Sequence, residues 1–293
     1  MIRNTLLTFG LLLIILLAAA AAAPTQADRL ADEGRIYFAG IGDNDSSEIF
    51  SMRPDGSDVV QLTDSAGDDT SADISSDGRR VVFVSDRDGN PEIYVMNADG
   101  SDEVRLTDYP ETDGDPAWSP DGARIAFRSQ RAPGGVVTDI FMMDAAGDNV
   151  VNLTQGTAAS IMAPAWSPDG MRIAFNGSRQ DEEEILVQTV DEPLGEDNPV
   201  RLTFTEGWSG YPDWSPDGSR IVFVRFQQMQ QEIYVMDADG GNPTPLTDDD
   251  ITDSTPVWSP DGTRIAFQSQ RLSLIHISEP TRRTPISYAV FCL

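Results

Sequence analysis

Short apolar stretches separated by polar turns recur along the chain from residue 35 onward. One kind alternates bulky and small side chains, as in Arg124–Phe127, where Ile125 and Phe127 flank Ala126. Alternation over so few residues predicts a β-strand. A second kind, Ile93–Met96, is apolar at every position, as expected of a strand that is covered on both faces. The same two kinds of strand recur at 172–175, 264–267 and 233–236.

A five-residue motif, Trp-Ser-Pro-Asp-Gly, repeats at a nearly constant spacing. It stands at 118–122, 166–170, 214–218 and 258–262, and Ile74–Gly78 is a degenerate copy. The turn glycines Gly34, Gly78, Gly122, Gly170, Gly218 and Gly262 are separated by 44, 44, 48, 48 and 44 residues. A period in the mid-forties is typical of units built from four short strands.

Two kinds of turn divide each unit. In Ser119–Gly122 the proline takes the second position and the glycine the fourth, as type I turns prefer. The turns Asn97–Gly100 and Asp237–Gly240 reverse the chain into a fourth strand, which we place at a recurring Leu-Thr pair. These pairs stand at 106–107, 153–154, 202–203 and 246–247.

The predicted fold is an all-β propeller of four-stranded blades. Each unit supplies four antiparallel strands that are apolar on both faces, and radial repetition is the arrangement that covers both faces of every sheet. The first strand of each unit is expected near Ala72, Ala117, Ala165, Asp213 and Val257.

Two longer strings carry a resemblance to a known family. Pro-x-Trp-Ser-Pro-Asp-Gly-x-Arg-Ile-Ala-Phe and Ile-Tyr-Val-Met-Asp-Ala-Asp-Gly resemble the WD-like propeller repeats of the TolB family over residues 35–271. The resemblance implies six blades and a periplasmic protein that docks other proteins, notably the peptidoglycan-associated lipoprotein Pal, without known catalysis. Similar repeats form the propeller of prolyl-oligopeptidase-like enzymes, in which a hydrolase domain follows. TolB has an α/β domain before its propeller, whereas here the repeats start at Arg35.

The N-terminus predicts export. Arg3 precedes an apolar stretch, 6–23, which ends in alanines and meets Pro24. This order is typical of a signal peptide, which we place at 1–27, followed by a linker at 28–34. The stretch also approaches the length that spans a bilayer, so an uncleaved N-terminal anchor is the alternative.

The C-terminal segment 272–293 leaves the repeat pattern after Arg271. Its last residues, 286–293, match the translation of a common sequencing-adapter end, so we treat 272–293 as a non-native tail and exclude it from the fold prediction. The propeller is then expected at 35–271, with its last blade truncated after the second strand.

Composition excludes several kinds of chemistry. The net charge of −28 comes from 48 acidic and 20 basic residues, and such a surface opposes binding to nucleic acid or anionic lipid. The single histidine, His276, and the single cysteine, Cys292, both lie in the tail. Residues 35–271 therefore lack the means for a histidine-assisted serine triad, a thiol nucleophile or an ordinary zinc site. We predict no catalytic residues, no metal and no cofactor in the propeller.

The two rims of the predicted propeller differ. The Ser-Pro-Asp-Gly and Ala-Asp-Gly turns fall on one rim, and the connections between second and third strands and between fourth and first strands fall on the other. We call the latter the variable rim, because its loops, including 108–115 and 131–138, differ most between repeats. Exposed aromatic residues there are candidate contacts for a protein partner, with hydrophobic capping of the rim as the alternative. The candidates are Tyr109, Trp208 and Tyr211.

Acidic residues stand five positions before the repeated tryptophan in three units, namely Asp69, Asp113 and Asp253. They are further candidates for partner contact. Turn formation by the aspartate side chains is the favoured alternative, because calcium needs six to eight oxygens from a shaped loop. The tryptophans themselves, Trp118, Trp166, Trp214 and Trp258, are expected to pack between blades.

Three functions remain open at this stage. The first is a non-catalytic exported scaffold, periplasmic or secreted, that binds a protein partner at the cell envelope. The second is the propeller of a truncated prolyl-oligopeptidase-like hydrolase. The third is a glycan-binding or calcium-dependent binding module that uses the acidic rim.

Overall fold

The computed structural model describes residues 35–53, 55–131, 138–156, 159–179, 182–192, 194, 198–204, 207–227, 229–269 and 289–292. The predicted signal peptide and linker lie outside the described residues, as does most of 272–293. The regular elements of the described chain are all β-strands. No helix within these ranges is long and apolar enough to cross a membrane.

The described strands form six antiparallel sheets, four with four strands and two with three. The three-stranded sheets are β1-β2-β3 and β20-β21-β22, and the four-stranded sheets are β4 to β7, β8 to β11, β12 to β15 and β16 to β19. The bounds are β1 Ile36–Ile41, β2 Ser47–Met52, β3 Val60–Gln61, β4 Asp69–Ile74, β5 Arg80–Ser85, β6 Glu92–Asn97, β7 Val104–Arg105, β8 Asp113–Trp118, β9 Arg124–Ser129, β10 Asp139–Asp144, β11 Val151–Asn152, β12 Ala159–Trp166, β13 Arg172–Arg179, β14 Glu182–Thr189, β15 Val200–Arg201, β16 Trp208–Trp214, β17 Arg220–Gln227, β18 Gln230–Asp237, β19 Thr244–Pro245, β20 Asp253–Trp258, β21 Ile265–Ser269 and β22 Ala289–Cys292.

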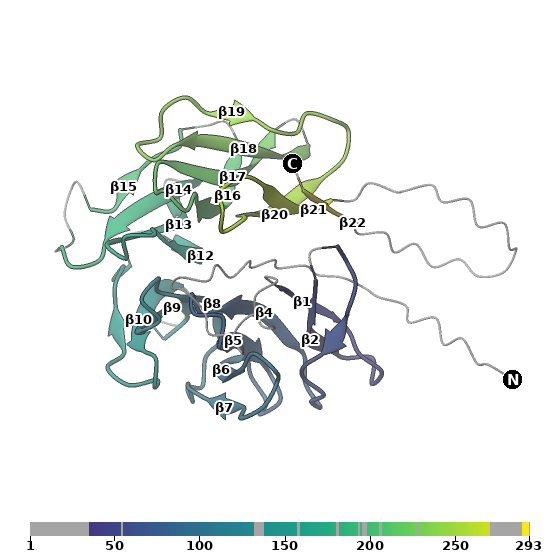
Figure 1. Cartoon of the computed structure of the whole chain (residues 1–293). Helices are drawn as coiled ribbons and strands as arrows, with labels where there is room; N and C mark the ends of the chain where they lie inside the picture. Colours follow the sequence, from purple (N-terminus) through teal and green to yellow (C-terminus); the bar gives the residue numbers. More distant parts are fainter. Residues whose placement is uncertain are drawn as a thin grey trace, which may run out of the picture.

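The sheets stand around a common axis as the blades of a propeller (Figure 1). The first strands β4, β8, β12, β16 and β20 lie innermost, and each contacts the next. Their predicted positions are confirmed.

The fourth strands are not where we placed them, because β7 covers Val104–Arg105 and ends just before the Leu106–Thr107 pair.

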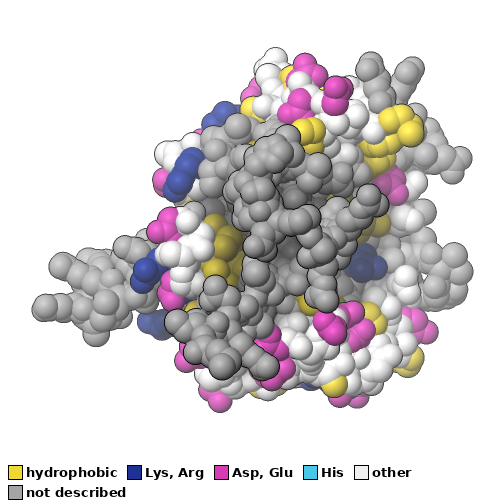
Figure 2. Space-filling view, turned by 90° about the vertical axis from the view of Figure 1, so that its right-hand side faces the viewer, with side chains coloured by type: hydrophobic (Ala, Val, Ile, Leu, Met, Phe, Trp, Pro, Cys, Tyr) yellow, Lys and Arg dark blue, Asp and Glu magenta, His cyan; other side chains and the backbone are white. Residues whose placement is uncertain are grey.

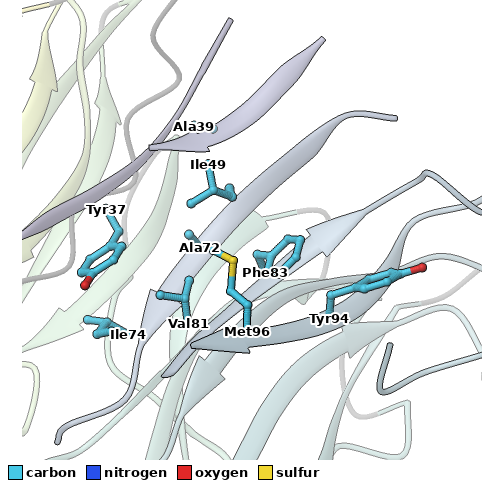
Figure 3. Close-up of a cluster of buried hydrophobic side chains, with 9 residues drawn as sticks. All are labelled: Tyr37, Ala39, Ile49, Ala72, Ile74, Val81, Phe83, Tyr94 and Met96. Carbon is cyan, nitrogen blue, oxygen red and sulfur yellow. The ribbon is translucent and has the colours of Figure 1, made fainter. Parts of the chain in front are cut away.

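Each blade buries both faces against its neighbours, as the apolar third strands predict. In β6 the side chains of Tyr94 and Met96 join a cluster with the first sheet, whereas those of Ile93 and Val95 join a cluster with the third. Figure 3 shows the first of these clusters, in which Tyr37, Ala39 and Ile49 of the first sheet meet residues of the second. All four β6 residues are at most 8% exposed, so the alternation of faces along one strand holds three sheets together.

The first and last sheets also pack against each other. Ile36 and Phe38 of β1 share a buried cluster with Ala266 of β21. The ring of described sheets therefore closes through side chains. A ring of six four-stranded blades stays a prediction, since two of the sheets have three strands.

Four tail residues that we excluded from the fold take part in it. Ala289–Cys292 form β22, which pairs antiparallel with β21. This is an apolar run, and the open edge of a two-stranded sheet offers it unpaired backbone groups. The boundary of the propeller at residue 271 stays a prediction.

In four of the described sheets an arginine stacks on the tryptophan of the next sheet. The guanidinium carbon of Arg172 lies 4.4 Å from the ring centre of Trp214, and that of Arg80 lies 4.6 Å from the ring centre of Trp118. The pairs Arg124 with Trp166 and Arg220 with Trp258 repeat this contact. The tryptophans are 4 to 9% exposed, so their predicted packing between blades is confirmed. The cation–π attraction adds to the stabilisation that burial of apolar area gives these interfaces.

A buried clasp recurs at the start of each third strand. The Thr107 hydroxyl accepts a hydrogen bond from the backbone N–H of Ile93 at 2.9 Å and donates one to the Glu92 carboxylate at 2.5 Å. Thr63 with Glu48 and Thr154 with Asp139 do the same. The Leu-Thr pair is thus the anchor that follows the fourth strand.

The Ala-Asp-Gly turns touch the preceding blade. Gly240 has a φ of +88°, and a Cβ atom placed there would lie 2.7 Å from the Leu202 carbonyl oxygen. Gly56 holds the same turn position in the first sheet with a φ of +81°, and a Cβ there would meet no atom within 4 Å. The two glycines therefore share the backbone strain, whereas Gly240 alone has the close contact.

We expect Gly240→Ala to lower the free energy of unfolding by about 2–4 kcal/mol, because left-handed strain and a clash with backbone both apply. Gly56→Ala is the matched control and is expected to cost about 1 kcal/mol from strain alone. Urea unfolding of both variants measures the difference. Equal losses in the two variants would show that the inter-blade contact is not tight.

Candidate functional site

The inner strands enclose a cavity of about 450 Å³ on the propeller axis. Its described walls come from β4, β8, β12, β16 and β20 and from the turns that follow them. Prolines and tryptophans make up much of this wall. The prolines are Pro116, Pro120, Pro164, Pro168, Pro212, Pro216, Pro256 and Pro260.

Each inner strand is bent by a bulge at the same place. The residue three positions before the tryptophan position has a φ between 45° and 53°, and the strand register shifts there. These residues are Ser71, Asp115, Ala163, Tyr211 and Thr255. In four of the five strands a proline comes next, and it has no N–H to offer at the exposed strand edge. Because the strain recurs in every inner strand, we assign it to the fold.

Two carboxyl groups in the wall stand just before the tryptophan position. Asp73 Oδ2 accepts the backbone N–H of Trp118 at 2.6 Å, and Asp213 Oδ2 accepts that of Trp258 at 2.7 Å. Each bond joins one blade to the next. Burial raises the pKa of Asp73 to about 8 and the pKa of Asp213 to about 7, in spite of these hydrogen bonds. The charge of Asp213 also raises the pKa of Asp73, so the two groups interact across the cavity.

The charges in this wall are acidic. Among the described lining residues, the ionisable side chains other than Tyr211 are Asp73, Asp115 and Asp213. Asp115 has its own counter-charge, because its Oδ2 lies 2.9 Å from Nε of Arg128. No arginine acts on the pKa of Asp73 or Asp213. Neither aspartate was predicted as a site residue, although the sequence has a signal: a carboxyl stands at a position that holds Ala117, Ala165 or Val257 in the other repeats.

The aromatic candidates Trp208 and Tyr211 lie together where β16 leaves the variable rim. The Trp208 ring stacks on Phe226 at 6.1 Å between centres and meets Tyr211 edge to face at 6.3 Å. Trp208 is partly buried and packs on the cluster between the fifth and sixth sheets, so capping accounts for part of its role. Tyr211 is 39% exposed and also lines the cavity. Burial raises the pKa of Tyr211, and Asp115 and Glu183 add to this effect.

Tyr109 is separate from that pair. It is 38% exposed on the loop between β7 and β8, and the Arg131 guanidinium carbon lies 4.7 Å from its ring centre. Its backbone N–H donates to Glu92 at 2.8 Å, so the buried clasp also fixes this loop. The structure therefore holds an exposed ring in a defined place on the variable rim.

The acidic candidates lie inside the blades. Asp69, Asp113 and Asp253 are each 0% exposed. Asp69 pairs with Arg87 at 2.9 Å, and Asp113 pairs with Arg131. Desolvation raises the pKa of both carboxyls despite these cations. Their burial argues against direct contact with a partner and for a bracing role within the blade.

The ion pairs of Asp69 and Asp113 have a sequence signal, which is a Ser-x-Arg motif at the end of the second strand. Arg87 and Arg131 each follow a serine at the end of the second strand by two residues, and each arginine Nε donates to that serine hydroxyl. The serine, arginine and aspartate thus connect the first strand to the second.

Within the described residues, no group of three or more His, Cys, Asp or Glu side chains is placed to hold a metal ion.

We expect Asp73 to make the protein less stable as the pH rises from about 4 to about 8. The folded state keeps its proton to a higher pH than the unfolded chain, so folding binds protons in this window and stability falls with increasing pH. Asp73→Asn keeps an oxygen for the Trp118 N–H but removes the titration. Its melting temperature should therefore exceed that of the parent at pH 9 and approach it at pH 4.

Asp108→Asn is a suitable control, because that side chain is 87% exposed. It should leave the decline of melting temperature with pH unchanged. A parent protein whose melting temperature rises steadily from pH 4 to pH 9, with no gain from Asp73→Asn, would contradict the assignment.

Comparison with known proteins agrees with this architecture. Solved structures similar to this chain include a protein assigned as TolB in Agrobacterium tumefaciens, with 24% identity and a TM-score of 0.65, covering 74% of this chain and 76% of that one. TolB from Acinetobacter baumannii has 21% identity and a TM-score of 0.69, covering 80% of this chain and 60% of that one. The described chain thus corresponds to less than two thirds of the second protein.

Propellers of enzymes are similar in shape as well. A puromycin-hydrolyzing peptidase of Mycobacterium tuberculosis has 17% identity and a TM-score of 0.57, covering 87% of this chain and 42% of that one. At these identities the likeness concerns the fold alone. No curated protein sequence matches the chain. The family described as TolB beta propeller domain matches residues 25–133 and 134–276, and the chain belongs to that family.

Proposed function

We propose that this chain is an exported, non-catalytic propeller that binds a protein partner at the cell envelope through its variable rim. The apolar N-terminal stretch supports export to the periplasm or the medium. Absence of histidine and cysteine from 35–271 supports a role without catalysis. We further propose that the intact protein closes six four-stranded blades.

The observation that carries the proposal is the set of ordered aromatic rings on this rim. The ring of Tyr211 contacts Trp208 edge to face, and Trp208 stacks on Phe226. These contacts hold the exposed Tyr211 ring in place before a partner binds. Tyr109 is held in a similar way by Arg131 and by the hydrogen bond to Glu92. Rigid aromatic anchors lose little conformational entropy on binding, which is why they dominate many interfaces. Asp69, Asp113 and Asp253 are buried, and ion pairs with Arg87 and Arg131 hold the first two.

Surface charge limits the kind of partner. Figure 2 shows acidic side chains along the upper and lower parts of the face in view, and arginines mainly at its left side. The chain as a whole carries a net charge of −28. Charge of this sign speeds encounter with basic partners and disfavours acidic ones.

The test is affinity capture from an envelope extract of the source cells, with the full chain as bait. We expect a specific partner that Tyr109→Ala and Tyr211→Ala each bind at least tenfold more weakly, since hot-spot truncation costs more than about 1.4 kcal/mol. Alanine is tolerated at the Tyr211 position, because Ala163 has the same backbone conformation in β12. The loss would therefore not reflect misfolding.

Met171→Ala is the control for this experiment. Met171 is 63% exposed but follows the Ser-Pro-Asp-Gly turn on the opposite rim. It should capture the partner as the parent does. Equal capture by all variants, or capture of no specific protein, would count against the rim as the binding surface. A hydrolase activity of the purified chain would contradict the non-catalytic role.

A further inference from the structure

The central cavity has the size and lining of a small-molecule site. A volume of about 450 Å³ falls within the range of pockets that enclose organic ligands. Tryptophan, proline and alanine side chains make its described wall largely apolar. The faces of the tryptophans are already covered by arginines of neighbouring blades, so the wall supplies apolar contact more than free aromatic faces.

Two carboxyls face this cavity from different sides. Asp73 is on β4 and Asp213 is on β16, and two other inner strands, β8 and β12, lie between them around the axis. Asp73 is 8% exposed, and its Oδ1 has no hydrogen-bond partner in the described structure. A buried carboxyl oxygen without a hydrogen-bond partner is costly, and in the wall of a cavity a bound polar group is one way to satisfy it.

Blade packing accounts for the Oδ2 atom of each carboxyl, which accepts the inter-blade hydrogen bond. It does not require a carboxyl at this position, because the equivalent residues of β8, β12 and β20 are Ala117, Ala165 and Val257, which pack against inter-blade clusters. Replacing alanine by aspartate at such a site costs stability once the group ionises. The cost is offset if a positively charged ligand binds there.

We propose that the central cavity binds an organic cation, an ammonium or guanidinium group on an apolar body, held between Asp73 and Asp213. An anion is disfavoured, because the described wall contains no basic residue. A calcium ion would need six to eight oxygens, whereas two carboxyls on separate strands offer few. An apolar body matches the prolines and alanines of the wall. The cavity shares Tyr211 with the rim contacts proposed above, whereas Tyr109 is absent from its described lining.

Binding of a cation favours the charged form of a carboxyl and therefore releases a proton. With a pKa of about 8, Asp73 is mostly neutral at pH 7 in the empty cavity, whereas Asp213, with a pKa of about 7, is about half ionised. Other charged groups near the cavity are Asp115, which is paired with Arg128, and the arginines Arg80 and Arg220, which stack on Trp118 and Trp258. None of them is among the causes of the two raised pKa values. Affinity for a cation should therefore rise with pH between about 6 and 8.

The experiment uses the full chain and three probes of similar shape: benzylamine, benzyl alcohol and benzoate. Titration calorimetry is expected to show saturable binding of benzylamine, with the neutral and anionic probes at least tenfold weaker. Benzylamine affinity should increase up to about tenfold per pH unit from 6 to 8, as release of one proton requires. The heat measured in buffers of different ionisation enthalpy should show that release directly.

Variants decide whether the two carboxyls form the site. Asp73→Asn and Asp213→Asn should each weaken benzylamine at least tenfold and reduce its pH dependence, while Asp108→Asn, on an exposed loop, should bind as the parent does. Asp73→Asn is expected to be folded and stable at high pH, so its loss of binding would not reflect unfolding.

Three results would overturn the proposal. The first is equal affinity for benzylamine and benzyl alcohol, which would show an apolar cavity without charge recognition. The second is absence of benzylamine binding. This holds also if calcium binds saturably and the two variants abolish that binding, because the site would then be a metal site. The third is benzylamine binding that both variants retain. Each result leaves the rim prediction for Tyr109 standing, because Tyr109 is absent from the described lining of the cavity.

Discussion

The structure depends on one constraint: every blade is apolar on both faces, so no blade can bury its core alone. In β6 the faces alternate so strictly that Tyr94 and Met96 belong to one interface and Ile93 and Val95 to the next. Sheets of this kind are stable only between two others, and a ring is the arrangement that gives each sheet two neighbours. At four of these interfaces an arginine that stacks on the tryptophan of the next blade adds a cation–π contact.

The same ring forces an unusual inner surface. Radial packing leaves the first strand of each blade with one unpaired edge that faces the axis, and such edges invite pairing with other chains. A bulge and a proline interrupt that edge in four of the five inner strands, for example at Tyr211 and Pro212. The cavity is thus a consequence of how the blades are protected at the centre. Its apolar character follows from the prolines that protect the inner strand edges and does not by itself indicate a ligand.

Much of the fold follows from local rules in the sequence. The Pro-Asp-Gly turn acts through its own residues: the Asp121 carboxylate accepts the Ser119 hydroxyl and the Ala123 N–H, so the motif predicts a hairpin wherever it stands. Positions that depend on other blades could not be found in this way. Asp69 looked like a turn residue on the surface, but Arg87 reaches back from the second strand and keeps it buried. The role of Leu106–Thr107 was missed for the same reason, because its partner is a glutamate on another strand.

The aspartates of the cavity show where the sequence departs from its own repeat for a reason outside packing. Ala117 and Val257 demonstrate that the position before tryptophan needs only a small or apolar side chain. An aspartate at this position lowers the stability of the fold once it ionises, because burial disfavours its charge and the opposite carboxylate repels it. Departures of this kind from local consistency are expected at functional sites. The hydrogen bonds from Asp73 to Trp118 and from Asp213 to Trp258 recover part of the cost, but they also place each carboxyl on a blade interface. A ligand that changes their charge would therefore act on contacts between blades, which links the cavity to the ring that encloses it.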